Sequence, residues 1–377
     1  MKTTFKRENS RADQPGRPLP PRFSVGKRET TGMFRLPRWH ELLALLLMFG
    51  LSLARAAQQN VEGARLDGHD YVPLAGWAHA NDLDWHWCDG GKMVEATNRA
   101  TRLVFEVNSA QVEINGIRVR LSFPFAAQKE VPFIAQFDLD TAVCPLLFPP
   151  HLVQTRTIKT ICLDPGHGGK DTGNRAGGQY EKNYTLPLAL ELRDQLQKAG
   201  FNVIMTRTMD TYVALPARPA LANQRGADLF VSLHFNATPT GRADAEGPET
   251  YCITPVGASS SNGHLESGEF GPAAGVGPVT ANRNEQKSLL LAYQVQESLV
   301  QNLTANDRGV KRARFAVLRD AAMPAILIEG GFMTNPAESK KIYTAAYHRQ
   351  MAEAIVKGIL AYQRLTVCSA NQSPSRL

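Results

Sequence analysis

Apolar and polar residues alternate over a short stretch in the first third of the chain. The apolar positions flank the dipeptide Asn115-Gly116, and they are Val112, Ile114, Ile117, Val119 and Leu121. An Asn-Gly pair between two alternating runs is the strongest short-range signal for a β-hairpin with a type I′ turn. With the strand-like run at 102–107, this pattern predicts a small β-rich or α+β domain over residues 60–150.

The second part of the chain, residues 155–365, alternates short apolar runs with longer stretches of helical periodicity. Strands are predicted at 157–163, 201–206, 228–233, 249–254, 315–318 and 325–328, and helices at 184–199, 218–225, 289–303 and 339–362. This alternation is typical of an α/β fold with a mostly parallel sheet and helices on both faces. Asn183 is the expected N-cap of the first helix.

One long segment interrupts this alternation. Residues 256–284 are rich in Gly, Ser and Ala and predict an insertion, which is either a mobile lid or a surface excursion. Residues 366–377 form a short tail after the predicted domain.

The first 56 residues have the layout of a leader. Arg35 and Arg38 precede an apolar run of 12 residues, Leu42–Leu53, which is followed by Ala54-Arg55-Ala56. Basic residues, a short apolar core and an A-x-A site predict a signal peptide that is cleaved after Ala56. The run is shorter than the roughly 20 residues that span a bilayer, which argues against an uncleaved anchor. We therefore expect export to the periplasm or cell envelope without a stable membrane anchor, and translation from Met33 would give a signal of normal length.

The charge of the chain is concentrated in this leader. Residues 1–56 hold 11 Lys/Arg and 4 Asp/Glu, which accounts for the whole net charge of +7. The remaining chain is therefore neutral, and nothing in it predicts a basic face for nucleic acid.

The five cysteines are scattered and form no C-x-x-C pair, which excludes a typical thiolate zinc site. Cys88 and Cys144 flank one small region of the first domain, and the sequence leaves open whether they form a disulfide or remain thiols.

Three predicted strands end on a titratable residue beside a glycine or another small residue. His167 follows the first strand, His234 the third and Glu329 the last. Ligands gather at the carboxyl ends of parallel strands, so we expect these side chains to form one site. Two histidines and one carboxylate suit a catalytic zinc, and spacing does not decide whether that carboxylate is Asp171 or Glu181.

A series of motifs follows in order from about Ile158 to Tyr362. They are L-D-P-G-H-G-G-K-D-T-G, Y-E-K, T-R-T-M-D, A-N-Q-R-G-A-D-L-F-V-S-L-H-F-N-A, G-P-E-T-Y and V-L-R-D-A-A-M-P-A-I-L-I-E-G-G-F-M-T-N-P-A-E. Together they resemble the zinc-dependent N-acetylmuramoyl-L-alanine amidase family of bacterial cell-wall hydrolases.

This resemblance implies a zinc-exopeptidase-like α/β fold. It implies that His167, Glu181 and His234 bind Zn²⁺ and that Glu329 is the catalytic acid/base. The implied reaction is hydrolysis of the amide between the lactyl group of N-acetylmuramic acid and L-alanine of the stem peptide, which makes peptidoglycan the expected partner. Whether a protein activator exists is left open.

The small first domain resembles another known domain. Its segments I-N-G-I-R-V-R-L and Y-V-P-L are similar to the N-terminal domain of copper amine oxidases, which also occurs as a stalk on cell-wall proteins. This resemblance assigns no catalytic residues.

Other polar residues of the second domain are candidates for supporting roles. Arg207 and Arg218 could bind carboxylates of the substrate or take part in structural ion pairs, and Asn236 could orient a ligand or the backbone. Asp164 could accept a proton from a ligating histidine or cap its own turn.

Two alternative functions remain from the sequence. One is another zinc amidohydrolase or exopeptidase of the same fold. The other is a non-catalytic protein that binds the cell wall, against which the intact set of ligands and Glu329 argue.

Overall fold

The computed structural model describes residues 63–149, 158–238, 243–258 and 284–371, with side chains up to Thr366. The predicted signal peptide, most of the insertion at 256–284 and residues 372–377 of the tail lie outside the described residues. None of the helices within the described ranges is both long and apolar enough to cross a membrane.

Residues 64–147 form the expected β-rich region with short helices. Its strands are β1 (Ala64–Leu66), β2 (His69–Pro73), β3 (Asp84–Cys88), β4 (Met93–Thr97), β5 (Arg102–Glu106), β6 (Gln111–Ile114), β7 (Ile117–Arg120), β8 (Ala126–Gln128) and β9 (Val131–Ala135). Its helical segments are α2 (Leu74–Ala80), η2 (Asp89–Gly91), α3 (Gln136–Asp138), η3 (Leu139–Val143) and α4 (Cys144–Leu147). Strands β1, β2, β9 and β8 make a small sheet, and β3 to β7 make an antiparallel meander.

The predicted hairpin is confirmed in its register. Ile114 of β6 pairs with Ile117 of β7 around Asn115 and Gly116. These two turn residues have φ values of 48° and 87°, as a type I′ turn requires.

The main sheet has the strand order β13-β10-β14-β17-β15-β16 and continues through β7 into the meander. Its strands are β10 (Thr160–Pro165), β13 (Asn202–Met205), β14 (Leu229–Asn236), β15 (Glu249–Ile253), β16 (Val310–Ala313) and β17 (Ala325–Phe332). The neighbouring strands β13, β10, β14 and β17 run parallel to one another, whereas β15 runs antiparallel to β17. At the far side, Val310 of β16 pairs with Val119 of β7. Whether residues 60–150 are a separate domain therefore stays a prediction.

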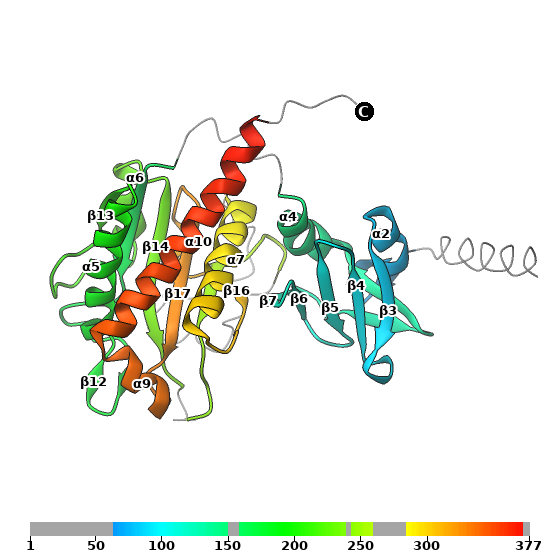
Figure 1. The fold of residues 1–377 in the computed structure, drawn as a ribbon, viewed down its shortest axis with the longest axis horizontal. Helices are drawn as coiled ribbons and strands as arrows, with labels where there is room; N and C mark the ends of the chain where they lie inside the picture. The colour runs from blue at the N-terminus through cyan, green and yellow to red at the C-terminus, as the bar shows by residue number, and fades with distance from the viewer. Residues whose placement is uncertain (1–62, 150–157, 239–242, 259–283, 372–377) are drawn as a thin grey trace, which may run out of the picture. The chain divides into compact units, whose positions relative to one another are not determined.

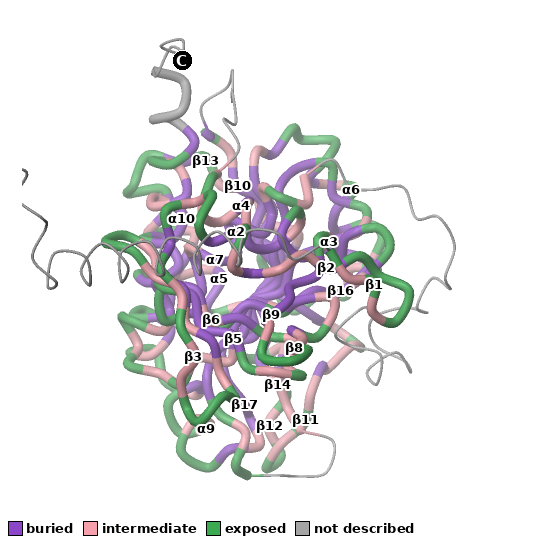
Figure 2. Tube along the Cα trace, turned by 90° about the vertical axis from the view of Figure 1, so that its right-hand side faces the viewer, coloured by how far each residue is buried: buried purple, intermediate pink, exposed green. Residues whose placement is uncertain are grey.

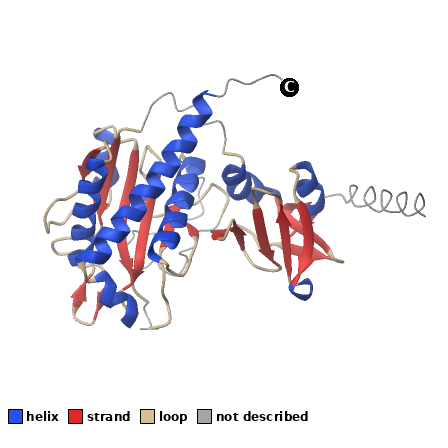
Figure 3. Ribbon diagram, viewed as in Figure 1, coloured by secondary structure: helices blue, strands red, loops and turns tan. Residues whose placement is uncertain are grey.

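Helices cover both faces of this sheet, as predicted for an α/β fold (Figure 1). They are α5 (Lys182–Lys198), α6 (Ala217–Gln224), α7 (Glu285–Leu303), α8 (Ala316–Arg319), α9 (Pro336–Ile342) and α10 (Ala345–Asn371). Helices α5, α7 and α10 lie on the face towards the viewer in Figures 1 and 3.

Period-two alternation along the strands divides the interior into two clusters. Ile161 and Leu163 of β10 pack with the helices α5, α7 and α10, whereas Cys162 between them packs with α6 and α8. Because both faces are covered, the central strands are buried along almost their whole length (Figure 2).

Three predicted elements were wrong in their bounds or type. Helix α5 begins at Lys182, so Asn183 lies inside it, and the Glu181 carbonyl accepts the first helical hydrogen bonds. The run at 315–318 contains the short helix α8, because a buried apolar run fits a helix as well as a strand. The helix predicted at 339–362 is two helices, and the Thr344 hydroxyl accepts from the Tyr347 backbone N–H at the start of the second.

Candidate active site

Two histidines and one glutamate meet at the carboxyl end of the parallel strands. His167 follows β10, Glu181 precedes α5, and His234 lies near the end of β14. One carboxylate oxygen of Glu181 lies 3.0 Å from His167 Nε2, and the other lies 2.9 Å from His234 Nδ1. The candidate ligand atoms of the three buried residues lie within 4.8 Å of one another.

Backbone hydrogen bonds fix the carboxylate of Glu181 between the two imidazoles. Its Oε1 accepts from Phe235 N at 3.0 Å, and its Oε2 accepts from Asn174 N at 2.9 Å. Burial by itself would raise the pKa of Glu181, but His167 and His234 hold it well below its usual value. The carboxylate is therefore ionised and faces both rings.

The residues of this cluster fit a metal ion. His167 Nε2 is buried and has no hydrogen-bond partner among the described residues, although Glu181 lies close to it. An unpartnered buried polar atom is costly, and a cation between the three side chains would satisfy it. Two imidazole nitrogens and one carboxylate oxygen are a common ligand set of catalytic zinc.

Asp171, the other carboxylate that the sequence left open, lies behind His167. Its Oδ1 is 2.9 Å from His167 Nδ1 and also accepts from Gly173 N at 3.1 Å. Burial would lower the pKa of His167, but Glu181 and Asp171 raise it to about 10. A carboxylate on the far nitrogen of a ligating histidine fixes the ring and its tautomer, so Asp171 is placed to orient His167.

Glycines let the backbone approach the two rings. A Cβ at Gly166 would collide with the ring of His234, and a Cβ at Gly173 would lie 2.5 Å from His167 Cδ2. The loop itself is unusual, because His167 has a φ of 61°, in the left-handed region.

We expect Gly166→Ala to weaken metal binding without removing a ligand, because the new methyl group displaces the ring of His234. A loss of about 10-fold or more in metal affinity, measured by competition with a chromophoric chelator, is the expected result. Gly76→Ala is the matched control, since a Cβ there meets nothing within 4 Å. Equal metal affinity in both variants would contradict the prediction.

Asp164 lies beneath the site and fills neither of its two predicted roles. Its carboxylate is fully buried and accepts from Arg218 at 2.8 Å, Thr206 at 2.6 Å and Ser232 at 2.8 Å. The Ser232 hydroxyl lies 3.2 Å from Nε2 of His234. The Ser232 hydroxyl therefore connects Asp164 to His234.

For Arg207 and Arg218 the sequence left substrate contact and a structural role open, and both side chains are almost fully buried, at 4% and 2% exposure. Arg207 donates to the carbonyl of Gly166 at 2.7 Å, and Arg218 donates to that of His167 at 3.0 Å. These contacts support the structural alternative: Arg218 forms an ion pair with Asp164, and both arginines hold the loop that carries His167.

We expect Arg218→Met to lower the free energy of unfolding by about 3–5 kcal/mol at neutral pH, because it leaves the buried Asp164 without its cation. Burial would raise the pKa of Asp164, but Arg218 and the hydroxyl donors hold it below its usual value. The pair therefore stabilises the fold above the ordinary pKa of an aspartate, and this stabilisation is lost as the pH falls through the lower folded-state value. Urea unfolding should show a deficit that shrinks in acid; a deficit independent of pH would contradict this account.

Glu329 stands next to the cluster in the sheet. It lies in β17 directly opposite His234 of β14. Its side chain is buried, and Oε2 has no hydrogen-bond partner within the described part of the chain. Burial, followed by the charges of Glu181 and Glu249, raises the pKa of Glu329 well above its usual value. Glu329 thus lies beside His234 in the sheet, and its role as the catalytic acid/base stays a prediction.

Glu249 is a buried acid beside the site to which the sequence assigned no role. It lies opposite Glu329 in the β15–β17 ladder. Asn236 Nδ2 donates to it at 2.9 Å, and Asn236 Oδ1 accepts from the Ala237 backbone N–H at 2.8 Å, so the amide orients Glu249 and the local backbone. Arg308 and Lys311 also bind its carboxylate and, against the effect of burial, hold its pKa low. The signal in the sequence is an acid at the start of an otherwise apolar strand.

Cys88 and Cys144, whose pairing the sequence left open, are both free thiols in the structure.

The fold and this cluster define an α/β protein with a candidate metal centre at the ends of its parallel strands. A family model described as N-acetylmuramoyl-L-alanine amidase matches residues 161–361. The chain belongs to the N-acetylmuramoyl-L-alanine amidase family, as the ordered motifs predicted.

Two relatives matched by sequence agree with this assignment. The amidase AmiC of Escherichia coli O6:H1 is 33% identical, and the match covers 83% of this chain and 82% of that protein. The amidase AmiC of Neisseria meningitidis serogroup B is 37% identical, but the match spans only 53% of its length and 55% of this chain. Among solved structures, an amidase from Clostridium difficile 630 is 36% identical over 55% of this chain and 98% of that chain, with a TM-score of 0.45. The resemblance of the small first domain stays a prediction.

Proposed function

We propose that this protein is a zinc-dependent hydrolase that cleaves the amide between the lactyl group of N-acetylmuramic acid and L-alanine of the peptidoglycan stem peptide. The observation that carries the proposal is the buried cluster of His167, Glu181 and His234, with Glu329 opposite His234 in the sheet. The family to which the chain belongs supports the substrate class.

Zinc held by these three side chains would polarise the amide carbonyl and lower the pKa of the attacking water from about 15.7 towards 7. Glu329 takes the proton of that water on a carboxylate oxygen and returns it to the departing nitrogen, which would otherwise be a poor leaving group. Glu181 contributes charge between the two rings, and Asp171 keeps His167 in one tautomer.

Two alternatives differ from this proposal. An exopeptidase would cleave another bond, and a wall-binding protein would have no turnover. An exopeptidase of the same fold would release terminal amino acids from the stem peptide. A non-catalytic wall-binding protein has no need for an acid buried beside a metal cluster, so the position of Glu329 favours an enzyme.

Mass spectrometry of muropeptides tests the proposal directly. Incubation of purified peptidoglycan with the protein should release free stem peptides that begin with L-alanine and leave intact N-acetylmuramic acid on the glycan. A chelator should abolish the release, and added Zn²⁺ should restore it. Release of single amino acids would favour the exopeptidase, and an unchanged digest would favour the binding protein.

We also propose that the protein is exported and acts on peptidoglycan in the periplasm or cell envelope. The support is the sequence of the leader, which lies outside the described residues. Terminal sequencing of the exported protein should begin at Ala57, whereas a mature chain that retains Leu42–Leu53 would contradict cleavage.

A further inference from the structure

One row of paired residues crosses the sheet from the candidate active site to the small first domain. Ile328 of β17 pairs with Thr250 of β15, and Thr250 in turn pairs with Val310 of β16. Beyond them, β16 joins β7 through the pair Val310 and Val119. This row begins at Ile328, the residue before Glu329, and crosses β15 and β16 to reach β7 of the first domain.

The charged residues next to this row share one face of the sheet. Val119, Val310 and Ile328 belong to the core cluster that packs against α5, α7 and α10, so their neighbours along each strand point to the opposite face. Those neighbours are Arg118 and Arg120 on β7, Lys311 on β16 and Glu329 on β17. The cations of the outer strands therefore lie on the same face as the catalytic candidate.

A hollow of about 210 Å³ opens between β7 and β16 on this face. Its wall carries four cations and no acidic residue, and it consists of Gln111, Arg118, Arg120, Arg308, Gly309, Val310 and Lys311. Arg308 and Lys311 share the carboxylate of Glu249, so the charge that is open to a ligand comes mainly from Arg118 and Arg120, and an anionic group beside them would be attracted.

Two of these cations are already held towards the active site. Arg308 and Lys311 both bind the buried carboxylate of Glu249. The guanidinium of Arg308 also lies 4.6 Å from the ring centre of Phe332, at the end of the strand that carries Glu329. The hollow is thus joined to the active site by direct contacts.

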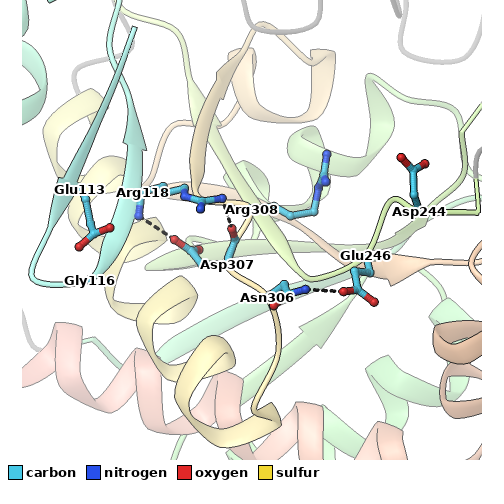
Figure 4. Close-up of a pocket in the computed structure, with 8 residues that line it drawn as sticks. All are labelled: Glu113, Gly116, Arg118, Asp244, Glu246, Asn306, Asp307 and Arg308. Atoms are coloured by element: carbon cyan, nitrogen blue, oxygen red, sulfur yellow. Dashed lines mark hydrogen bonds between the residues drawn. The ribbon is translucent and has the colours of Figure 1, made fainter. Parts of the chain in front are cut away.

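Hydrogen bonds connect the first domain to the rest of the chain beside this hollow. The Arg118 backbone N–H donates to Asp307 Oδ2 at 2.7 Å, and its guanidinium donates to the Asp307 carbonyl at 3.1 Å (Figure 4). A Cβ at Gly309, whose φ is 88°, would lie 2.7 Å from the Arg118 carbonyl. These contacts bring the hairpin close enough for its arginines to complete the basic wall.

A second hollow, of about 430 Å³, adjoins the first, and the two share Arg118 and Arg308. The acidic residues that line it are Glu113, Asp244, Glu246 and Asp307 (Figure 4). The positive charge is therefore confined to the side of Arg120 and Lys311, where an anionic group would be bound.

We propose that Arg118, Arg120, Arg308 and Lys311 form a carboxylate-binding groove, shared by both parts of the chain, that receives the acidic stem peptide. The inference rests on the proposed function, because the stem peptide is the part of that substrate with free carboxylates. Three strand steps of about 4.8 Å separate β17 from β7, roughly 14 Å in all. An extended peptide of about four residues covers that span. A stem peptide whose first amide lies at Glu329 would therefore place its later carboxylates over the groove.

Steady-state kinetics on paired substrates tests the groove. A soluble muropeptide with free stem carboxylates is compared with its carboxyl-amidated counterpart, using the full-length protein and Arg120→Gln. We expect the protein to favour the free carboxylates, and Arg120→Gln to lower kcat/KM on that substrate by about 3- to 10-fold through KM. Turnover of the amidated substrate should stay nearly unchanged. Arg120 is exposed and lies at the end of β7, so its replacement spares the core.

Arg99→Gln is the matched control, because Arg99 is an exposed arginine of the same domain in the turn between β4 and β5. Equal use of the two substrates, or equal effects of the two variants, would overturn the groove and leave the proposed function intact.

A calorimetric titration of the protein with the free stem tetrapeptide measures binding independently of turnover. We expect binding that weakens with salt and is lost in Arg120→Gln but not in Arg99→Gln. If neither muropeptide is cleaved, the proposed function fails. The titration still shows whether the groove binds the stem peptide. Peptide binding that is insensitive to Arg120 or to amidation would overturn it.

Discussion

Glu329→Gln should lower turnover of peptidoglycan by about 10²- to 10⁴-fold, the usual contribution of a general acid–base group. The substitution keeps the shape of the side chain and removes the group that carries the proton. Glu329 is buried opposite His234 but lies outside the His167–Glu181–His234 cluster, so metal content should stay at its original level. Release of free stem peptides and metal content by mass spectrometry measure the two effects on one preparation.

Glu353→Gln is a suitable control, because that side chain is 59% exposed on α10 and pairs only with the neighbouring Lys357. It should leave both turnover and metal content unchanged. A Glu329→Gln enzyme that works at the original rate would mean that another base is used, and one that loses its metal would place Glu329 among the ligands.

Replacement of any one ligand should remove metal and activity together. His167→Ala, Glu181→Ala and His234→Ala each take one of three protein ligands from the cluster, and such a site cannot spare one. Asp171→Asn should have a smaller effect, about 10- to 100-fold in metal affinity, because Asp171 only orients the ring of His167. Metal affinity measured by chelator competition should therefore separate the three ligand variants from Asp171→Asn.

The exposed His86 on β3 offers a control for loss of an imidazole, and His86→Ala should bind metal normally. The ligand assignment would be reversed if Glu181→Ala kept its full metal content while Asp171→Ala lost it. Far-ultraviolet circular dichroism of each variant should show that the loss of metal does not reflect loss of the fold.

Local patterns in the sequence determined much of the architecture. The hairpin at Asn115-Gly116 depends on a turn that only a few residue pairs adopt, so it was predicted with its register. The central strands were recognised because apolar runs mark strands that are covered on both faces. His167, His234 and Glu329 were grouped because parallel strands end at one edge of a sheet.

The tertiary structure decided which polar groups contact one another at that edge of the sheet. Asp171 and Glu181 are equivalent in sequence spacing, but only the start of α5 places a carboxylate between both imidazoles. For Arg207 and Arg218 the sequence left substrate contact and a structural role open, and the structure shows both donating to carbonyls of the turn after β10.

The sequence alone did not predict the basic groove, for a related reason. Arg120 and Lys311 are far apart along the chain, and only the pairing of β7 with β16 brings them to one hollow. Sequence patterns report the environment of each segment, such as its period and its burial. Partners that belong to different segments depend on strand order and register, and the packing of the whole chain sets these.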